Sequence, residues 1–230
     1  MKKLIITLAA LVATTGAFSQ LNFGVKVGGN LSTISGMVSE DNGLDWGDLA
    51  SAEASQAMKL GFNAGVYAEY MVMPLLGVQV EANFSMQGVN TTATASSSLL
   101  GVSSTTKTAY TANYVNVPVL AKLHFANLRV FAGPQIGFAT GLKSTATTTG
   151  KDDSKENINK NTFESGDYSG VDFSLVLGGQ YKINRNIGVD ARYNFGLGNL
   201  FPTLKNDEGE VTREGFGKQG VLQLGVFYEF

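Results

Sequence analysis

The chain has 230 residues, of which 43% are hydrophobic, 16% are charged and 28 are glycine. The hydrophobic fraction is too high for a disordered chain, and the charged fraction lies below the ~25% usual in soluble proteins. The absence of cysteine excludes disulfides, thiolate metal sites, cysteine nucleophiles and lipid attachment to an N-terminal cysteine, and the formal charge of −2 offers no basic surface for nucleic acid.

The N-terminal segment has the pattern of an export signal. Residues 1–3 carry two lysines, residues 4–13 are apolar, and Ala17-Phe18-Ser19 places small residues where a signal peptidase cleaves. We therefore expect residues 1–19 to be a cleaved signal peptide and residues 20–230 to be one exported domain. Ten apolar residues are too few to cross a bilayer as a helix, which takes about 20. A retained N-terminal anchor is the alternative.

Beyond this signal, apolar and polar residues alternate along eight segments, which is the pattern of β-strands with two different faces. In the clearest of them, 187–197, every odd position is apolar or aromatic, and the even positions are Gly188, Asp190, Arg192, Asn194 and Gly196. The expected strands are 21–34, 60–72, 76–89, 110–125, 128–142, 171–183, 187–197 and 221–230.

Short and long connections alternate between these strands. The tight turns are 73–75, 126–127 and 184–186, and the long polar segments are 35–59, 90–109, 143–169 and 199–219. Strands joined by short turns pair antiparallel, and short turns at one end with long loops at the other are typical of outer-membrane barrels. The sequence predicts an all-β fold, an eight-stranded antiparallel up-and-down transmembrane β-barrel with four long extracellular loops and three short periplasmic turns.

The choice of the inward face separates this barrel from a soluble, lipocalin-like one. Large side chains fill the apolar face of the last three strands, and a narrow eight-stranded interior has little room for them. The polar face is rich in glycine, which suits a crowded interior. Aromatic residues also lie near strand ends, where lipid headgroups favour them. These are Tyr70, Phe125, Tyr181, Tyr228 and Phe230.

Ten ionisable residues lie on the predicted inward face, and their charges balance. Burying a lone charge is costly unless the charge is paired. We therefore expect a salt-bridged structural network and a closed lumen; a narrow water path lined by the same charges, hence a small-solute or ion channel, is the alternative. The residues are Lys26, Glu69, Glu81, Lys122, Arg129, Asp172, Lys182, Asp190, Arg192 and Glu229.

Five segments resemble the PorT-like family of outer-membrane β-barrel domains. They are 23–32 (FGVKVGGNLS), 61–67 (GFNAGVY), 113–120 (NYVNVPVL) followed by Lys122, 132–138 (AGPQIGF) and 188–193 (GVDARY). The resemblance implies an eight-stranded barrel that the outer-membrane assembly machinery inserts, and the last strand, with Val226, Tyr228 and Phe230, resembles the C-terminal insertion signal. One lineage of the family serves a protein-secretion system, so an accessory role there is a further alternative.

Catalytic and metal-binding patterns are weak. The single histidine, His124, has no matching serine and is expected to form hydrogen bonds in the lumen or to lie at the interface. The acidic run 41–48 lacks the spacing of a calcium loop, and neither a phosphate-binding loop nor H-E-x-x-H occurs. We expect no enzymatic activity, no catalytic residue, no metal and no cofactor.

The long loops are the expected contact surface. Residues 90–111 and 144–169 are hydrophilic and of low complexity, so they either extend the hairpins or stay mobile. Trp46 is a candidate anchor for a partner, with loop packing or an interfacial position as the simpler interpretation. We expect a structural or accessory protein of the Gram-negative outer membrane that contacts lipid, with an envelope protein as candidate partner and no nucleic acid.

Overall fold

The structure, a computed structural model, describes residues 20–36, 51–97, 102–150, 156–163, 168–201, 203–205, 211–213 and 215–230. The expected signal peptide, the acidic run 41–48 and Trp46 lie outside these ranges. Among the described residues there is no helix long and apolar enough to cross a bilayer. The strands are β1 (Leu21–Ile34), β2 (Ser51–Met73), β3 (Leu76–Ser97), β4 (Val102–Phe125), β5 (Leu128–Gly150), β6 (Glu156–Thr162), β7 (Val171–Lys182), β8 (Ile187–Gly196), β9 (Leu204–Lys205), β10 (Val211–Arg213) and β11 (Gln219–Glu229).

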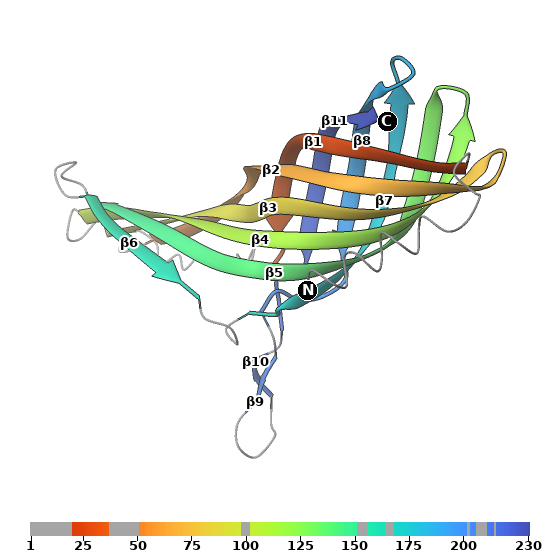
Figure 1. Ribbon diagram of the computed structural model, residues 1–230. Helices are drawn as coiled ribbons and strands as arrows, with labels where there is room; N and C mark the ends of the chain where they lie inside the picture. The colour runs from red at the N-terminus through yellow and green to blue at the C-terminus, as the bar shows by residue number, and fades with distance from the viewer. Residues whose placement is uncertain are drawn as a thin grey trace.

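Eight of these strands close into an antiparallel ring in the order β1, β2, β3, β4, β5, β7, β8, β11 (Figure 1). The ring closes where β1 pairs with β11, from Gly24 opposite Glu229 to Ile34 opposite Gln219. Closure matters because hydrocarbon offers backbone groups no hydrogen-bond partner. The predicted eight-stranded barrel is confirmed.

The short turns are found where the sequence predicts them. Pro74 and Leu75 join β2 to β3, Ala126 and Asn127 join β4 to β5, and 183–186 join β7 to β8. All three turns lie toward one end of the ring, whereas β6 and the β9–β10 pair lie far from them (Figure 1). We call the end with the turns proximal and the opposite end distal.

Much of the sequence predicted as long loops is in fact strand. Residues 51–58, 90–97, 102–109 and 143–150 continue β2 to β5 beyond the ring, and β6 pairs with β5 beside them. We call this five-stranded extension the distal sheet. Where the structure describes 90–109 and 143–150, the first of the two expectations for these segments, that they extend the hairpins, is confirmed. The strands themselves were not predicted, because both faces of these segments are polar, which hides the alternation. Threonine nevertheless favours strands, and Thr94 bonds Thr105 across the sheet at 3.3 Å.

The outer wall of the ring is apolar. On β7, the outward side chains Val171, Phe173, Leu175, Leu177 and Tyr181 are 45–56% exposed, whereas Ser174 and Gln180 face inward and are buried. An apolar outside around a polar inside is the inverse of a soluble barrel, so the lipocalin-like alternative is wrong. The aromatic residues predicted near strand ends, Tyr70, Phe125, Tyr181, Tyr228 and Phe230, are exposed on this wall.

Glycines on the inward face let neighbouring strands approach closely. A Cβ added to Gly28 would lie 2.3 Å from the backbone oxygen of Leu224, whereas one added to the outward Gly29 would meet nothing nearer than 3.9 Å. A side chain at Gly28 would therefore force β1 and β11 apart at the seam that closes the ring.

We expect Gly28→Ala to lower the free energy of unfolding by about 1–3 kcal/mol, because over-packing displaces backbone. The measurement is urea unfolding of the detergent-solubilised barrel, followed by the difference in gel mobility between boiled and unboiled samples. Gly29→Ala is the matched control and should unfold near the wild-type midpoint. Equal midpoints for the two variants would contradict the inward placement of Gly28.

Candidate functional site: the barrel interior

The centre of the lumen holds four buried charges on three strands, which we call the central network: Lys26 on β1, Glu81 on β3, and Asp190 and Arg192 on β8. The Arg192 guanidinium donates to both Glu81 oxygens at 3.0 and 2.9 Å and to Asp190 at 2.8 Å. The Lys26 ammonium also donates to Glu81. All four residues are at most 6% exposed. Each charge therefore has a partner where water cannot solvate it.

A second group of charges, the basal network, lies nearer the proximal end. Arg129 forms two hydrogen bonds with Glu229, at 2.6 and 3.3 Å, and Lys182 donates to the same carboxylate at 2.7 Å. Lys122 donates to Glu69 at 3.0 Å, and His124 contacts the other Glu69 oxygen. These six side chains come from β2, β4, β5, β7 and β11, so they connect strands on different sides of the ring.

Two glutamines join the networks. Gln79 accepts a hydrogen bond from Lys122 and donates one to Glu81 at 2.5 Å. Gln180 accepts from Lys122 at 2.9 Å and donates to Asp190 at 2.9 Å. A continuous chain of charge-assisted hydrogen bonds therefore runs from the proximal end to the centre of the lumen.

The structure places nine of the ten predicted lumen charges in these two networks, and His124 lies among them as a hydrogen-bonding residue. Asp172 is the exception. It is half-buried on the distal side of the central network and forms no ion pair with any described residue. The sequence showed that Asp172 faces inward but not that it lies apart from the basic residues.

Distal to the central network, uncharged polar side chains fill the lumen. Asn30 donates to Ser85 at 2.9 Å and accepts from Asn63 at 2.6 Å, and Gln135 donates to Ser174 at 2.9 Å. Among the described residues there is no group of three or more His, Asp or Glu side chains placed to hold a metal ion.

An apolar cluster, which we call the apolar cap, lies beyond this polar layer. In it, Phe201 stacks on Phe216 with ring centroids 4.8 Å apart, and their backbones form a β-bridge. The cap was not predicted because Leu200 and Phe201 lie in a segment read as a polar loop, and its other buried members lie near the distal ends of four separate predicted strands. Its buried members are Ile34, Val89, Ala112, Tyr114, Leu142, Leu200 and Phe201.

The interior changes from polar to apolar because the surroundings of the strands change. Along the inward face of β3, buried Glu81, Asn83 and Ser85 give way to buried Val89, where the outer wall gives way to the polar distal sheet. In β5, Thr140 has no residue opposite it in the β4 register, although its hydroxyl donates to the Asn113 carbonyl at 3.1 Å. This bulge brings Leu142 inward. Where the outer face of a strand contacts lipid, its inward face can be polar. Where the outer face contacts water, the inward face must be apolar to form a core.

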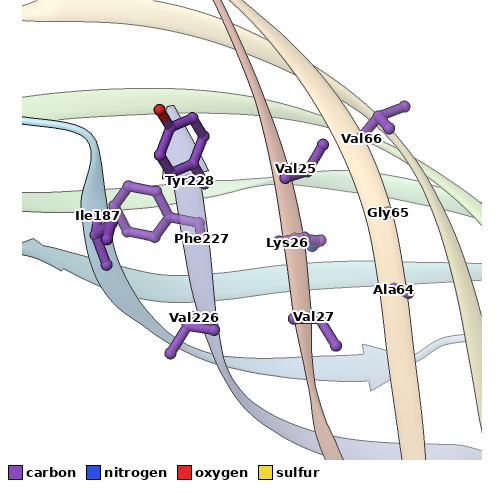
Figure 2. Close-up of a pocket in the computed structure, with 10 residues that line it drawn as sticks. All are labelled: Val25, Lys26, Val27, Ala64, Gly65, Val66, Ile187, Val226, Phe227 and Tyr228. Atoms are coloured by element: carbon purple, nitrogen blue, oxygen red, sulfur yellow. The ribbon is translucent and has the colours of Figure 1, made fainter. Parts of the chain in front are cut away.

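The outer wall also carries apolar grooves. One of them has a volume of about 600 Å³ and crosses β8, β11, β1 and β2. Its walls include Val25, Val27, Val66 and Tyr228, shown in Figure 2. The groove belongs to the lipid-facing surface, and the Lys26 side chain beside it is 4% exposed. Val226, Tyr228 and Phe230 are exposed on the same wall, at 49%, 42% and 73%; their role as an insertion signal remains a prediction.

The chain is similar to proteins of known structure and matches one family model. Among solved structures, the neisserial surface protein A is 12% identical with a TM-score of 0.42, and the match covers 90% of this chain and 97% of that one. The attachment invasion locus protein Ail of Yersinia pestis is 15% identical with a TM-score of 0.40, over 92% and 99%. A search of curated proteins found no match. The model of the outer membrane protein β-barrel domain matches residues 15–202, and the chain belongs to this family.

Proposed function

We propose that this protein is a non-enzymatic outer-membrane barrel with a structural or accessory role and a lumen that does not conduct. The observation that carries the proposal is the pairing of charges across the lumen. Glu81 binds Arg192 and Glu229 binds Arg129, partners that come from different sides of the ring. A water-filled path through the centre would have to separate these ion pairs.

Two further features support a closed lumen. The bonds of Gln79 and Gln180 leave the central and basal networks no break between them. The apolar cap lies over the distal end, where Leu200 and Phe201 are 2% and 7% exposed. An ion entering from that side would have to cross a hydrophobic cluster, which is costly for a hydrated charge.

Reconstituting the purified protein in planar lipid bilayers tests this function. We expect no conductance steps of porin size, because the side chains that fill the lumen are held by ion pairs. A porin reconstituted in the same lipid is the positive control. Reproducible small steps whose ion selectivity changes in Arg192→Met would instead support the alternative, a narrow ion channel.

Within the family, we propose that this protein is PorT-like. It is supported by the positions of the five resembling segments, which lie on β1, β2, β4, β5 and β8. We further assign the protein to the Gram-negative outer membrane after cleavage of residues 1–19, with Val226, Tyr228 and Phe230 guiding insertion by the assembly machinery. The mass of the N-terminal peptide of the mature protein tests the cleavage site.

The distal sheet is the surface through which an accessory role would act. It extends β2 to β5 beyond the lipid-facing wall, and residues 53–58 of β2 are exposed throughout. An envelope protein, including a component of a secretion system, is the partner that we propose. Affinity purification in mild detergent, with a variant in which a short turn replaces 90–109 as control, would identify such a partner; identical recovery by both proteins would argue against this surface.

A further inference from the structure

Three lysines lie together on one face of the distal sheet, and we call them the lysine patch: Lys107 on β4, Lys143 on β5 and Lys160 on β6. These strands are neighbours in the sheet (Figure 1). Lys160 is directly opposite Thr145 of β5, and Lys107 is directly opposite Thr147. Opposite residues of antiparallel strands share a face, as do residues two apart on one strand. The three lysines therefore surround Thr145 and Thr147 on a single face.

This face of the distal sheet is the outer one, which continues the lipid-facing wall. On β5, Leu142 and Ser144 face inward and are buried, whereas Lys143 between them is exposed. Lys107 and Lys160 are exposed as well. The three side chains therefore point to the surroundings of the barrel and not into the lumen.

The lysine patch has no counter-charge within the part of the chain that the structure describes. None of its members forms a salt bridge there. Glu53 shares the face but lies on β2, two strands from Lys107, and Glu156 is four residues from Lys160 along β6. Lys143 and Lys160 are diagonal neighbours on adjacent strands, about 7–8 Å apart. Two ammonium groups at this spacing repel each other unless an anion lies between them.

The patch lies just beyond the lipid-facing wall. Val115 on β4 pairs with Phe138 on β5, and the two side chains are 37% and 46% exposed on that wall. Lys143 is opposite Thr111, four residues from Val115 toward the distal end, or about 13 Å along the strand. Because barrel strands tilt by about 45°, the rise above the wall is about 9 Å. The headgroup layer is roughly 5–8 Å deep, and a long lysine side chain reaches back to it.

We propose that the lysine patch binds the phosphate group of an anionic lipid in the leaflet at the distal end, with Lys143 and Lys160 as its main contacts. Lysine binds phosphate as a point charge, and the Thr145 hydroxyl on the same face is a further hydrogen-bond donor. The acyl chains of this lipid lie on the wall below, against Val115 and Phe138. The wall alone accepts any acyl chain, so the patch is what selects a phosphate-bearing headgroup, whether or not the lumen conducts.

The test is native mass spectrometry of the full-length barrel in a neutral detergent, titrated with phosphatidic acid or with phosphatidylcholine of the same acyl chains. We expect the wild type to bind phosphatidic acid more tightly. The double variant Lys143→Gln with Lys160→Gln should bind phosphatidic acid about 30-fold more weakly, about fivefold for each lysine, and phosphatidylcholine as the wild type does. Both lysines are exposed, so the variant should fold, and its gel mobility before boiling checks this.

The matched control is Arg185→Gln with Lys218→Gln, which removes the same charge at two exposed positions outside the patch. It should keep the wild-type affinity for phosphatidic acid, and so should Lys143→Arg with Lys160→Arg. Equal affinity of the wild type for the two lipids, or an equal loss in the control, would overturn the proposal. Displacement of the lipid by inorganic phosphate or dextran sulfate at the same concentration would also overturn it, because the patch would then bind a soluble anion.

Discussion

Replacing Glu81 by glutamine is expected to lower the free energy of unfolding by about 3–5 kcal/mol, the range for removing one partner of a buried ion pair. The Glu81 carboxylate is bound by both Lys26 and Arg192. Arg192 keeps Asp190 as a partner in the variant, but Lys26 loses its only salt bridge among the described residues. The main effect is therefore a lysine ammonium left buried without a counter-charge. Urea unfolding of the barrel in detergent measures it.

Glu53→Gln is the control, because it makes the same chemical change at an exposed position of the distal sheet. It should change the free energy of unfolding by less than about 0.5 kcal/mol. The double variant Lys26→Met with Glu81→Gln should be more stable than Glu81→Gln alone, since it also removes the orphaned charge. A Glu81→Gln barrel as stable as the wild type would show that the central network is solvated and would remove the basis for a closed lumen.

Placing a lysine at Leu177 is expected to destabilise the barrel by about 2–4 kcal/mol, as measured for basic residues on the lipid face near the bilayer midplane. Leu177 is 56% exposed on the outer wall of β7. It lies between Phe173 and Tyr181, both on the same wall, so its side chain is far from either end of the lipid-facing segment. The measurement is unfolding in liposomes, where the surroundings of the wall are hydrocarbon.

Ile158→Lys provides a matched control, because Ile158 is 55% exposed on β6 of the distal sheet, outside the apolar wall. This substitution should leave the free energy of unfolding within about 0.5 kcal/mol of the wild type. Ile158 and Leu177 have nearly the same exposure, but we assign Leu177 to lipid and Ile158 to water. Equal destabilisation by the two substitutions would contradict the boundary between lipid-facing wall and distal sheet.

The strands of the ring could be predicted because their signal is local. Alternation in 171–183 identifies which side chains share a face, and the structure places Leu175 and Leu177 outward and Ser174 and Gln180 inward accordingly. The distal sheet could not be predicted in this way. Thr91, Thr106 and Thr148 carry polar side chains on a sheet whose other face is also polar, so no alternation marks its strands.

The same distinction between local and long-range signals applies to the candidate site. Every predicted lumen charge faces inward, since facing depends only on position along a strand. The pairing of Arg129 with Glu229 joins residues 100 positions apart and depends on how the closed ring brings β5 opposite β11. That Asp172 forms no ion pair with a described basic residue depends on the same geometry.

By itself, the amino-acid sequence determined the number and order of the ring strands, their short turns, and which residues face lipid, because a strand exposes alternate side chains to opposite surroundings. Only the tertiary structure decided which inward charges pair, that the Thr-rich segments continue as a sheet, and that scattered apolar residues meet as a cap over the lumen. These features depend on contacts between distant strands, and those contacts exist only once the register of the closed ring is set.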